Sequence, residues 1–244
     1  MKKGWNLIKW VLLLGYFPVM LAFVSANHRS TICSNVKVIV KDSLDIRFVS
    51  GDEIRTSVLK KYPDMLGYVV KNLNFNEIED FVNRHSAVSR CEVFETVQGV
   101  VYIEVKQHKP MLRVFAADGT YYLDRNGLQI PVFKNFSART LVVNGAVSKE
   151  DRIDLLNVGR LITEDEFWSA QIEQIYIRKN NEYVLVPRVG DHWILLGQPI
   201  NVDIKLRNLR ALYTDGLLPK EWNDFKLINL KYENQVLCSK NRNL

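Results

Sequence analysis

The densest group of side chains suited to acid–base chemistry is the acidic run Glu164, Asp165 and Glu166. Two nearby carboxylates can act as general acid and general base when their surroundings push their pKa values apart. This run follows Thr163, which is a suitable helix cap, and acidic residues in a first helical turn are favoured by the helix dipole. We therefore interpret the run as the start of a helix, with an acid–base pair as the alternative.

Residues that bind metals or act as nucleophiles are scattered along the chain. No histidine lies within helical or zinc-finger spacing of a cysteine. The sequence also lacks G-x-S-x-G, H-E-x-x-H and a glycine-rich phosphate loop. We expect no catalytic residue, no metal and no cofactor, and a site assembled from distant residues is the alternative. The residues concerned are His28, His85, His108, His192, Cys33, Cys91 and Cys238.

One isolated carboxylate, Asp124, precedes the turn-forming pair Asn126-Gly127. It has no titratable partner at a useful spacing. We expect Asp124 to accept hydrogen bonds from the backbone of this turn. We also expect most of the cysteines to be unpaired, with Cys91 buried in a strand.

Composition excludes several classes of protein. The chain has 244 residues, a formal net charge of +6 and 25% charged residues, which suits one or two modest domains. Lysine and arginine alternate with acidic residues, and no nucleic-acid-binding motif is present. The basic charge therefore predicts a solvated surface and no nucleic-acid partner.

An uncharged apolar run extends from Trp10 to Val24, and with Leu7 and Ile8 it approaches the ~20 residues that cross a bilayer. We predict a transmembrane helix at residues 7–26. A cleaved signal peptide is the alternative, because the run ends in small residues.

The charges beside this run predict its orientation. Lys2, Lys3 and Lys9 favour a cytoplasmic N-terminus by the positive-inside rule. We therefore expect a cytoplasmic tail at residues 1–6 and export of everything after the helix.

After a short linker at 27–35, the pattern predicts a small α+β domain at 36–109. Ser50 and Asn74 each precede a helical stripe and are followed three residues later by glutamate, as in a capping box. Two alternating strands follow, joined around Gly99. The order β-α-α-β-β predicts a three-stranded sheet with two helices on one face.

Residues 110–240 are expected to form a mostly antiparallel β-domain with flanking helices, followed by a polar tail at 241–244. One helix is predicted within 148–170 and another within 203–216. The inner side chains that we predict for these two helices are Ile153, Leu156, Leu161 and Ile162, and Ile204, Leu209 and Leu212.

Apolar and polar residues alternate from Phe225 to Cys238 without a proline. This pattern predicts one long final strand. A final strand at a sheet edge has unpaired N–H and C=O groups that can recruit another chain.

Four stretches of the chain, in order, are FNEIEDFVNRHSAVSRCEVF, VVYIEVKQHKPMLRV, GTYYLDRNGLQIPV and LINLKYENQV. Together they resemble the bacterial cell-division family FtsQ/DivIB. The first two are similar to its helix-plus-strand segment and to its strand ending in a basic–proline junction. The third resembles its aromatic-Asp-x-x-Gly…Pro hallmark, and the fourth its last strand, "(I/V)-D-L-R-Y", although Asn229 and Lys231 replace the aspartate and arginine.

The resemblance implies a POTRA domain at 36–109 and a non-enzymatic protein of the inner membrane at the division septum. It implies FtsB-like and FtsL-like partners, docked by strand addition on the last strand, and further divisome partners on the POTRA domain. Tyr232 is the expected anchor. The implied partner-binding residues are Lys231, Tyr232, Asn234, Gln235 and Val236.

One alternative remains for the role of the final strand and one for the class of protein. The final strand is an ordinary edge protected by Lys226, Lys231 and Lys240, or the chain is another exported POTRA-containing transport or secretion component. The absence of ten-residue amphipathic barrel strands argues against a complete outer-membrane insertase.

Overall fold

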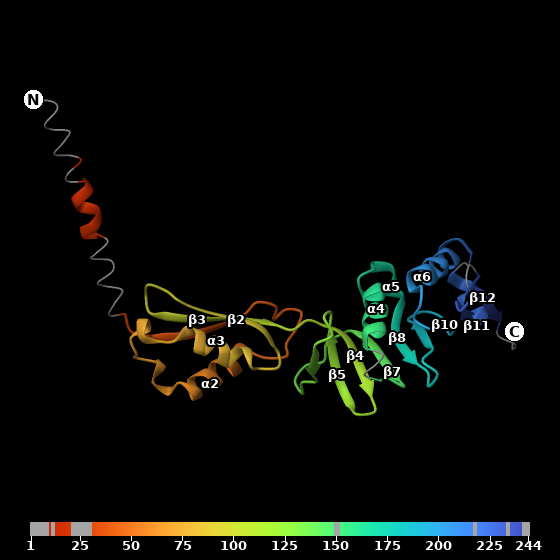
Figure 1. Cartoon of the computed structure of the whole chain (residues 1–244), viewed down its shortest axis with the longest axis horizontal. Coiled ribbons are helices and arrows are strands. Elements are labelled where there is room, and N and C mark those ends of the chain that lie inside the picture. The colour runs from red at the N-terminus through yellow and green to blue at the C-terminus, as the bar shows by residue number, and fades with distance from the viewer. Residues whose placement is uncertain are drawn as a thin grey trace, which may run out of the picture. The chain divides into compact units, whose positions relative to one another are not determined.

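A computed structural model describes residues 10, 13–20, 31–148, 152–216, 219–232 and 235–240. The chain divides between Gln107 and His108 into two compact units (Figure 1). Each unit has its own sheet, three-stranded in the first and nine-stranded in the second.

The first unit has the predicted order β-α-α-β-β, with two short 3₁₀ turns between its helices. The turns are Pro63–Met65 and Val70–Asn72. The main elements are β1 (Asn35–Val40), α2 (Gly51–Lys61), α3 (Phe75–Asn83), β2 (Val88–Glu95) and β3 (Val100–Gln107).

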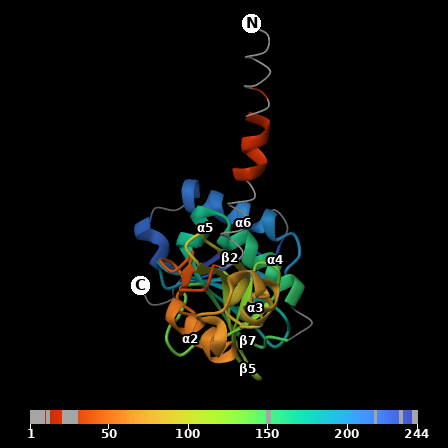
Figure 2. The ribbon, with the colours of Figure 1, turned by 90° about the vertical axis from the view of Figure 1, so that its left-hand side faces the viewer.

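The sheet of the first unit has the order β1-β3-β2, with β1 parallel and β2 antiparallel to β3. Helix α2 contacts β1 and helix α3 contacts β2, and Figure 2 shows the two helices side by side. On β3, Val101 and Ile103 are fully buried, whereas Tyr102 between them is half-buried. The predicted α+β domain is therefore confirmed.

Both predicted helix caps of this unit are confirmed. Ser50 Oγ accepts a hydrogen bond from the Glu53 N–H at 3.1 Å. Asn74 Oδ1 accepts one from the Glu77 N–H at 3.3 Å. Each cap satisfies one of the free N–H groups at a helix start. The caps fix where each helix begins and therefore which face is buried.

The segment before β1 also packs into the first unit. The Cys33 N–H donates to the Tyr68 carbonyl, and the Cys33 carbonyl accepts from the Gly67 N–H, both at 2.8 Å. Cys33 and Cys91 are buried, and all three cysteines are unpaired. The prediction that Cys91 is buried in a strand is confirmed.

The second unit contains nine strands and three α-helices among its described residues. Its strands are β4 (Pro110–Ala116), β5 (Gly119–Asp124), β6 (Gln129–Pro131), β7 (Leu141–Gly145), β8 (Ile172–Ile177), β9 (Tyr183–Pro187), β10 (Trp193–Gly197), β11 (Phe225–Asn229) and β12 (Leu237–Lys240). Its helices are α4 (Arg152–Thr163), α5 (Glu166–Gln171) and α6 (Val202–Ala211). A short π-helix at Leu212–Gly216 and a 3₁₀ helix at Pro219–Asp224 follow α6.

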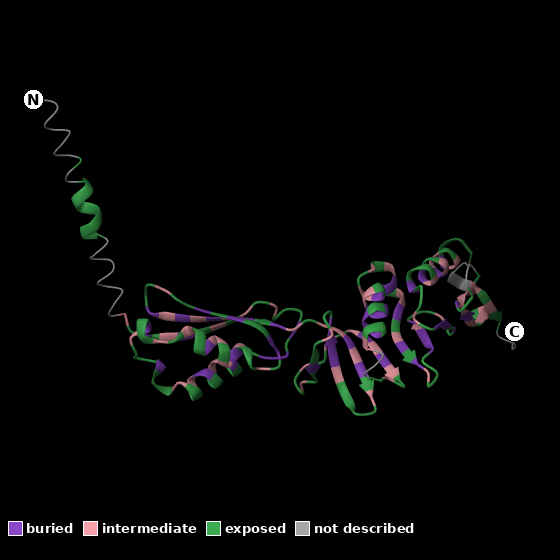
Figure 3. Ribbon diagram, viewed as in Figure 1, coloured by how far each residue is buried: buried purple, intermediate pink, exposed green. Residues whose placement is uncertain are grey.

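The strands of the second unit lie in the order β12-β11-β10-β9-β8-β7-β4-β5-β6. The pairings β4–β7, β7–β8 and β10–β11 are parallel and the other five are antiparallel, as predicted for a mostly antiparallel domain. Figure 1 shows α4, α5 and α6 along one side of this sheet. The core lies between these helices and the central strands, where Figure 3 shows buried positions.

The predicted continuous helix within 148–170 is wrong, because two helices occupy this segment. The cap of the second is Asp165, whose Oδ1 accepts a hydrogen bond from the Trp168 N–H at 3.1 Å. Thr163 ends α4 and donates to the Gly159 carbonyl at 2.8 Å, so its predicted capping role is also wrong. The acidic run does mark a helix start, two residues after Thr163.

The predicted inner face of α4 is only partly right. Leu156 and Ile162 are buried, but Ile153 is 73% exposed and Leu161 39% exposed. The face is set by Gly159, where an added Cβ would lie 2.9 Å from Leu112 Cδ2 of β4. Leu155, Val158 and Gly159 are therefore buried on α4 in place of Ile153 and Leu161.

The inner face of α6 is also only partly as predicted. Leu209 is buried, whereas Ile204 is 41% exposed and Leu212 is half-buried. Val202 and Leu206 are buried in place of Ile204. The buried stripe is therefore Val202, Leu206 and Leu209, which face the sheet.

The predicted single final strand is wrong. Two antiparallel strands, β11 and β12, occupy this segment, and Asn229 pairs with Leu237 where they meet. We call β11, residues 230–236 and β12 the C-terminal hairpin. The interleaving of apolar and polar residues across this segment resembled one strand, although it breaks at Val236 and Leu237.

Among the described residues, no helix combines the length and the apolar character needed to cross a membrane. Residues 13–20 are helical. The rest of the transmembrane helix predicted at 7–26 lies outside the described residues, apart from Trp10.

In the turn after β5, Asp124 accepts backbone hydrogen bonds, as predicted. Asp124 Oδ1 accepts hydrogen bonds from the Asn126 N–H at 2.9 Å and the Leu128 N–H at 2.7 Å. Gly127 has a φ of +83°, which glycine adopts without strain. Asp124 is only 9% exposed, so water replaces these bonds poorly.

We expect Asp124→Ala to lower the free energy of unfolding by about 1–2 kcal/mol, because two partly buried backbone N–H groups lose their acceptor. Urea denaturation followed by circular dichroism measures this change. The control is Asp118→Ala at the exposed turn before β5, with an expected change within about 0.5 kcal/mol. Equal effects of the two substitutions would contradict the assigned role of Asp124.

Candidate functional site

The two ends of the nine-stranded sheet differ in their capacity to accept another strand. At one end lies β6, which is three residues long and ends in Pro131, a residue without a backbone N–H. At the other end lies β12, Leu237–Lys240, which contains no proline. The outer side of β12 is therefore the open edge of this sheet.

The chain bends directly after β11. The Leu230 N–H donates to the Leu195 carbonyl at 2.9 Å, and the Leu230 side chain is only 2% exposed. Asn229 Oδ1 accepts a hydrogen bond from the Lys231 N–H at 3.0 Å, which is the local bond of an Asx turn. These contacts end β11 and turn Lys231 and Tyr232 away from its line.

Lys231 faces the neighbouring strands of its own unit. Its ammonium donates to Glu182 Oε1, and its stem packs on Gly197, where an added Cβ would lie 2.6 Å from Lys231 Cγ. Glu182 is 8% exposed, and Arg178 lies 3.5 Å from its second carboxylate oxygen. The hydrogen bond from Lys231 holds the pKa of the Glu182 carboxyl below its usual value.

Tyr232 is 54% exposed and lines a cavity of about 440 Å³ beside α6. The cavity is bordered by Ile200 and Ile204, which are 65% and 41% exposed. On its wall, the Lys205 ammonium donates to the Leu196 carbonyl at 2.9 Å. Tyr232 thus presents a ring and a hydroxyl beside an open apolar surface.

The remaining predicted binding residues are dispersed. Val236 is half-buried and packs against the core, and Gln235 is exposed. Asn234 lies outside the described residues. The structure therefore brings Lys231 and Tyr232 together at one cavity, in a loop and not along a strand.

One exposed apolar residue of the edge was not predicted. Leu237 is 47% exposed and begins β12. In the sequence, Leu237 directly follows the apolar Val236, so the alternation of apolar and polar residues breaks there. This break was the only sequence signal of the bend and of the exposed Leu237.

A buried aromatic cluster supports the C-terminal hairpin. His192 Nε2 lies 2.5 Å from the Tyr213 hydroxyl, and the Tyr213 ring stacks on Trp222 at 4.8 Å. His192 is 1% exposed, and burial lowers its pKa. Burial raises the pKa of Cys238 in β12, which packs against the same core. The cluster links the loop before β10 to the segments that lead into β11.

Carboxylates of the acidic run are engaged in ion pairs. Asp165 lies 2.5 Å from the Arg210 guanidinium, whose hydrogen bond lowers the Asp165 pKa. Glu164 lies 2.8 Å from Arg125. Across the described ranges, no three histidine, cysteine or acidic side chains are grouped to hold a metal ion.

In the first unit, side chains from the helices reach both edges of the sheet. Arg55 Nε donates to the Val36 carbonyl of β1 at 2.9 Å. The Val93 N–H of β2 donates to Glu79 Oε1 at 2.7 Å. Each contact occupies one backbone group that strand addition would need.

Comparisons with known sequences agree with this architecture. The family model described as FtsQ/DivIB, C-terminal related, matches residues 109–239. The model of the POTRA-like domain matches residues 31–106. No curated protein is similar enough to this chain to count as a match.

We expect Lys231→Met to lower the free energy of unfolding by about 1–3 kcal/mol, because buried Glu182 loses its main donor. Since the folded-state pKa of Glu182 is lowered, this stability is present above the unfolded pKa of about 4.3 and is lost as pH falls through the folded value. Urea titrations across that pH range test both effects.

The control for this prediction is Lys226→Met on β11, where the lysine is exposed. Its expected change lies within about 0.5 kcal/mol. A Lys231→Met protein as stable as the Lys226→Met protein would show that the Lys231–Glu182 contact does not hold the hairpin.

Protonation of His192 is expected to destabilise the second unit. Because the folded-state pKa of His192 is lowered, the unfolded chain binds more protons below about pH 6.5, and stability falls as pH decreases through that value. His192→Gln should flatten this slope in urea titrations between neutral and mildly acidic pH. His108→Gln is the control and should keep the slope of the native chain.

Proposed function

Because this chain belongs to the FtsQ/DivIB C-terminal related family, a family of non-enzymatic cell-division proteins, we propose that it assembles the division machinery by binding other proteins. It links early division proteins to FtsB-like and FtsL-like membrane proteins and to septal peptidoglycan synthesis, with strand addition at its second unit. It acts by positioning partners and uses no cofactor.

The observation that carries this proposal is the difference between the two ends of the nine-stranded sheet. Edge β6 is short and ends in Pro131, whereas edge β12 has an unpaired outer side. A segment of the FtsB-like partner adds as a tenth strand beside β12, so backbone hydrogen bonds supply affinity. This places the docking strand on 237–240, beyond the residues that the sequence pattern favoured.

Tyr232, which precedes β12 in the chain, supplies specificity. Its ring is half exposed beside the 440 Å³ cavity, and it offers a large apolar area with a polar tip. Leu237 adds an exposed apolar contact at the start of β12. Lys231 contributes indirectly. Its ammonium is hydrogen-bonded to Glu182, and this contact holds the backbone directly before Tyr232. Gln235 is exposed and extends the contact surface, whereas Val236 packs against the core and supports it.

We place the chain in the cytoplasmic membrane at the division septum, with the N-terminus in the cytoplasm. Support comes from the helical segment 13–20, where the apolar side chains are largely exposed. Leu14 and Phe17, for example, are 69% and 62% exposed, which suits contact with lipid.

The first unit recruits other divisome proteins. Because both edges of its sheet carry side-chain contacts from α2 and α3, its free sheet face is the better candidate surface. Tyr102 and Phe94 stack there at 5.5 Å, and Lys37 lies 5.7 Å from the Tyr102 ring centre. Such an aromatic group suits a partner with apolar side chains.

The test is a titration of the full-length chain with the extracytoplasmic end of the FtsB-like protein from the same genome. We expect saturable binding that Tyr232→Ala weakens about tenfold, equivalent to about 1.4 kcal/mol. Leu237→Ser should weaken it in the same direction. Tyr68→Ala, at a tyrosine 48% exposed in the first unit, is the matched control and should leave binding unchanged.

Amide hydrogen exchange then separates the possible modes of binding. Slower exchange on β12 in the complex supports strand addition. Binding that ignores both Tyr232 and Leu237, without protection of β12, refutes docking at this edge. No binding by a folded chain refutes the proposed partner and favours another class of POTRA-containing protein.

A further inference from the structure

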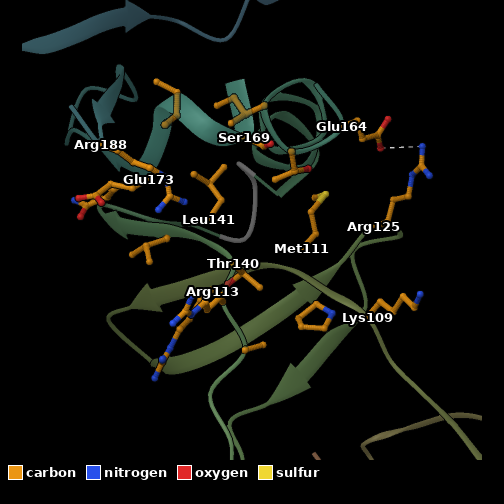
Figure 4. Close-up of a pocket in the computed structure, with 18 residues that line it drawn as sticks. Lys109, Met111, Arg113, Arg125, Thr140, Leu141, Glu164, Ser169, Glu173 and Arg188 are labelled. Carbon is orange, nitrogen blue, oxygen red and sulfur yellow. Dashed lines mark ion pairs between the residues drawn. The ribbon is translucent and has the colours of Figure 1, made fainter. Parts of the chain in front are cut away.

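A second and larger cavity lies in the second unit, away from the C-terminal hairpin. Its volume is about 810 Å³, within the range of about 300–1,000 Å³ typical of ligand sites. It lies where β4, β7 and β8 begin, with α4 and α5 on its other side (Figure 4). No residue of α6, β11 or β12 lines it.

Positive charge dominates this cavity, which we call the cationic trench. It contains two carboxylates, Glu164 and Glu173, and Figure 4 shows them at opposite ends. One of them, Glu164, is already paired with Arg125 at 2.8 Å. The five cationic side chains of the trench are Lys109, Arg113, Arg125, Arg139 and Arg188.

Most of these cations have no counter-ion. Within the part of the chain that the structure describes, Lys109, Arg139 and Arg188 form no ion pair. Arg139 and Arg188 are exposed, so their guanidinium groups are accessible. The trench therefore carries positive charge that an anionic ligand would neutralise.

Arg113 is the most firmly placed of the cations. Its guanidinium donates to Ser137 Oγ at 2.6 Å and lies 5.1 Å and 5.6 Å from the ring centres of Phe115 and Tyr122. These contacts orient the group without neutralising it. Its Nε and the nearby Thr140 Oγ1 are both buried, and neither has a hydrogen-bond partner among the described residues.

The uncharged lining residues restrict the chemical class of ligand that the trench can bind. Pro110, Met111, Ala138 and Val142, all half-buried, form an apolar part of the wall. None of the 18 described lining residues is aromatic, so the trench offers no ring on which a sugar would stack. A small inorganic anion would leave the apolar part of the wall uncovered. A peptide with carboxylates beside an aliphatic side chain matches both parts of the wall.

We propose that the cationic trench binds a short acidic peptide segment of a partner protein. The carboxylates of the segment pair with Arg113, Arg139 and Arg188, and an aliphatic side chain packs on Met111 and Val142. This site is separate from the docking edge at β12 and gives the second unit two distinct peptide-binding surfaces.

The test is fluorescence anisotropy with the full-length chain and a labelled synthetic heptapeptide that has a central leucine flanked by glutamates. We expect saturable binding, and we expect the double variant Arg139→Glu, Arg188→Glu to weaken it at least about tenfold. A peptide with serine in place of the leucine should bind less tightly, because it leaves the apolar wall uncovered.

The matched control is the double variant Lys179→Glu, Arg207→Glu, which makes the same charge change at exposed positions outside the trench. It should bind like the native chain. Equal loss in both double variants would show only long-range attraction and would overturn the proposal. Absence of saturable binding, equal affinity for the serine peptide, or complete displacement by inorganic phosphate at constant ionic strength would also overturn it.

Discussion

The contact between Lys231 and buried Glu182 determines where the sheet of the second unit ends. A carboxylate that is 8% exposed needs a cationic donor, and Lys231 supplies one from the loop after β11. Together with the burial of Leu230, this contact diverts the chain from the line of β11. The chain then returns as β12, and β12 becomes the outermost strand.

The sheet edges therefore differ in their capacity to accept another strand. In the first unit, Arg55 and Glu79 each bond a backbone group at one edge, and in the second unit β6 ends at Pro131. Only the outer side of β12, among the described sheet edges, has neither a proline nor a side-chain hydrogen bond to its backbone from another element. Sheet edges that could pair with another chain are usually protected, so an unprotected edge is a suitable binding site for a partner.

The departures from the family pattern are compatible with this geometry. Asn229 stands where the resembled pattern has aspartate, and its Oδ1 still accepts the Lys231 N–H. Lys231 stands where that pattern has arginine, and a lysine offers a single compact charge to Glu182 where a guanidinium offers a planar fork. Both substituted residues therefore take part in the contacts that bend the chain after β11, and Tyr232 lies beside the cavity.

The sequence by itself determined the family, the β-α-α-β-β order, the caps at Ser50 and Asn74 and the role of Asp124, because each depends on short-range chemistry. It did not reveal the bend after Asn229, the face of α4 or the cationic trench. Those depend on contacts between distant residues, such as Lys231 with Glu182 and Gly159 with Leu112. Leu230 and Lys231 each bond to residues far away in the chain, so only tertiary packing decided that the chain bends and which strand forms the edge.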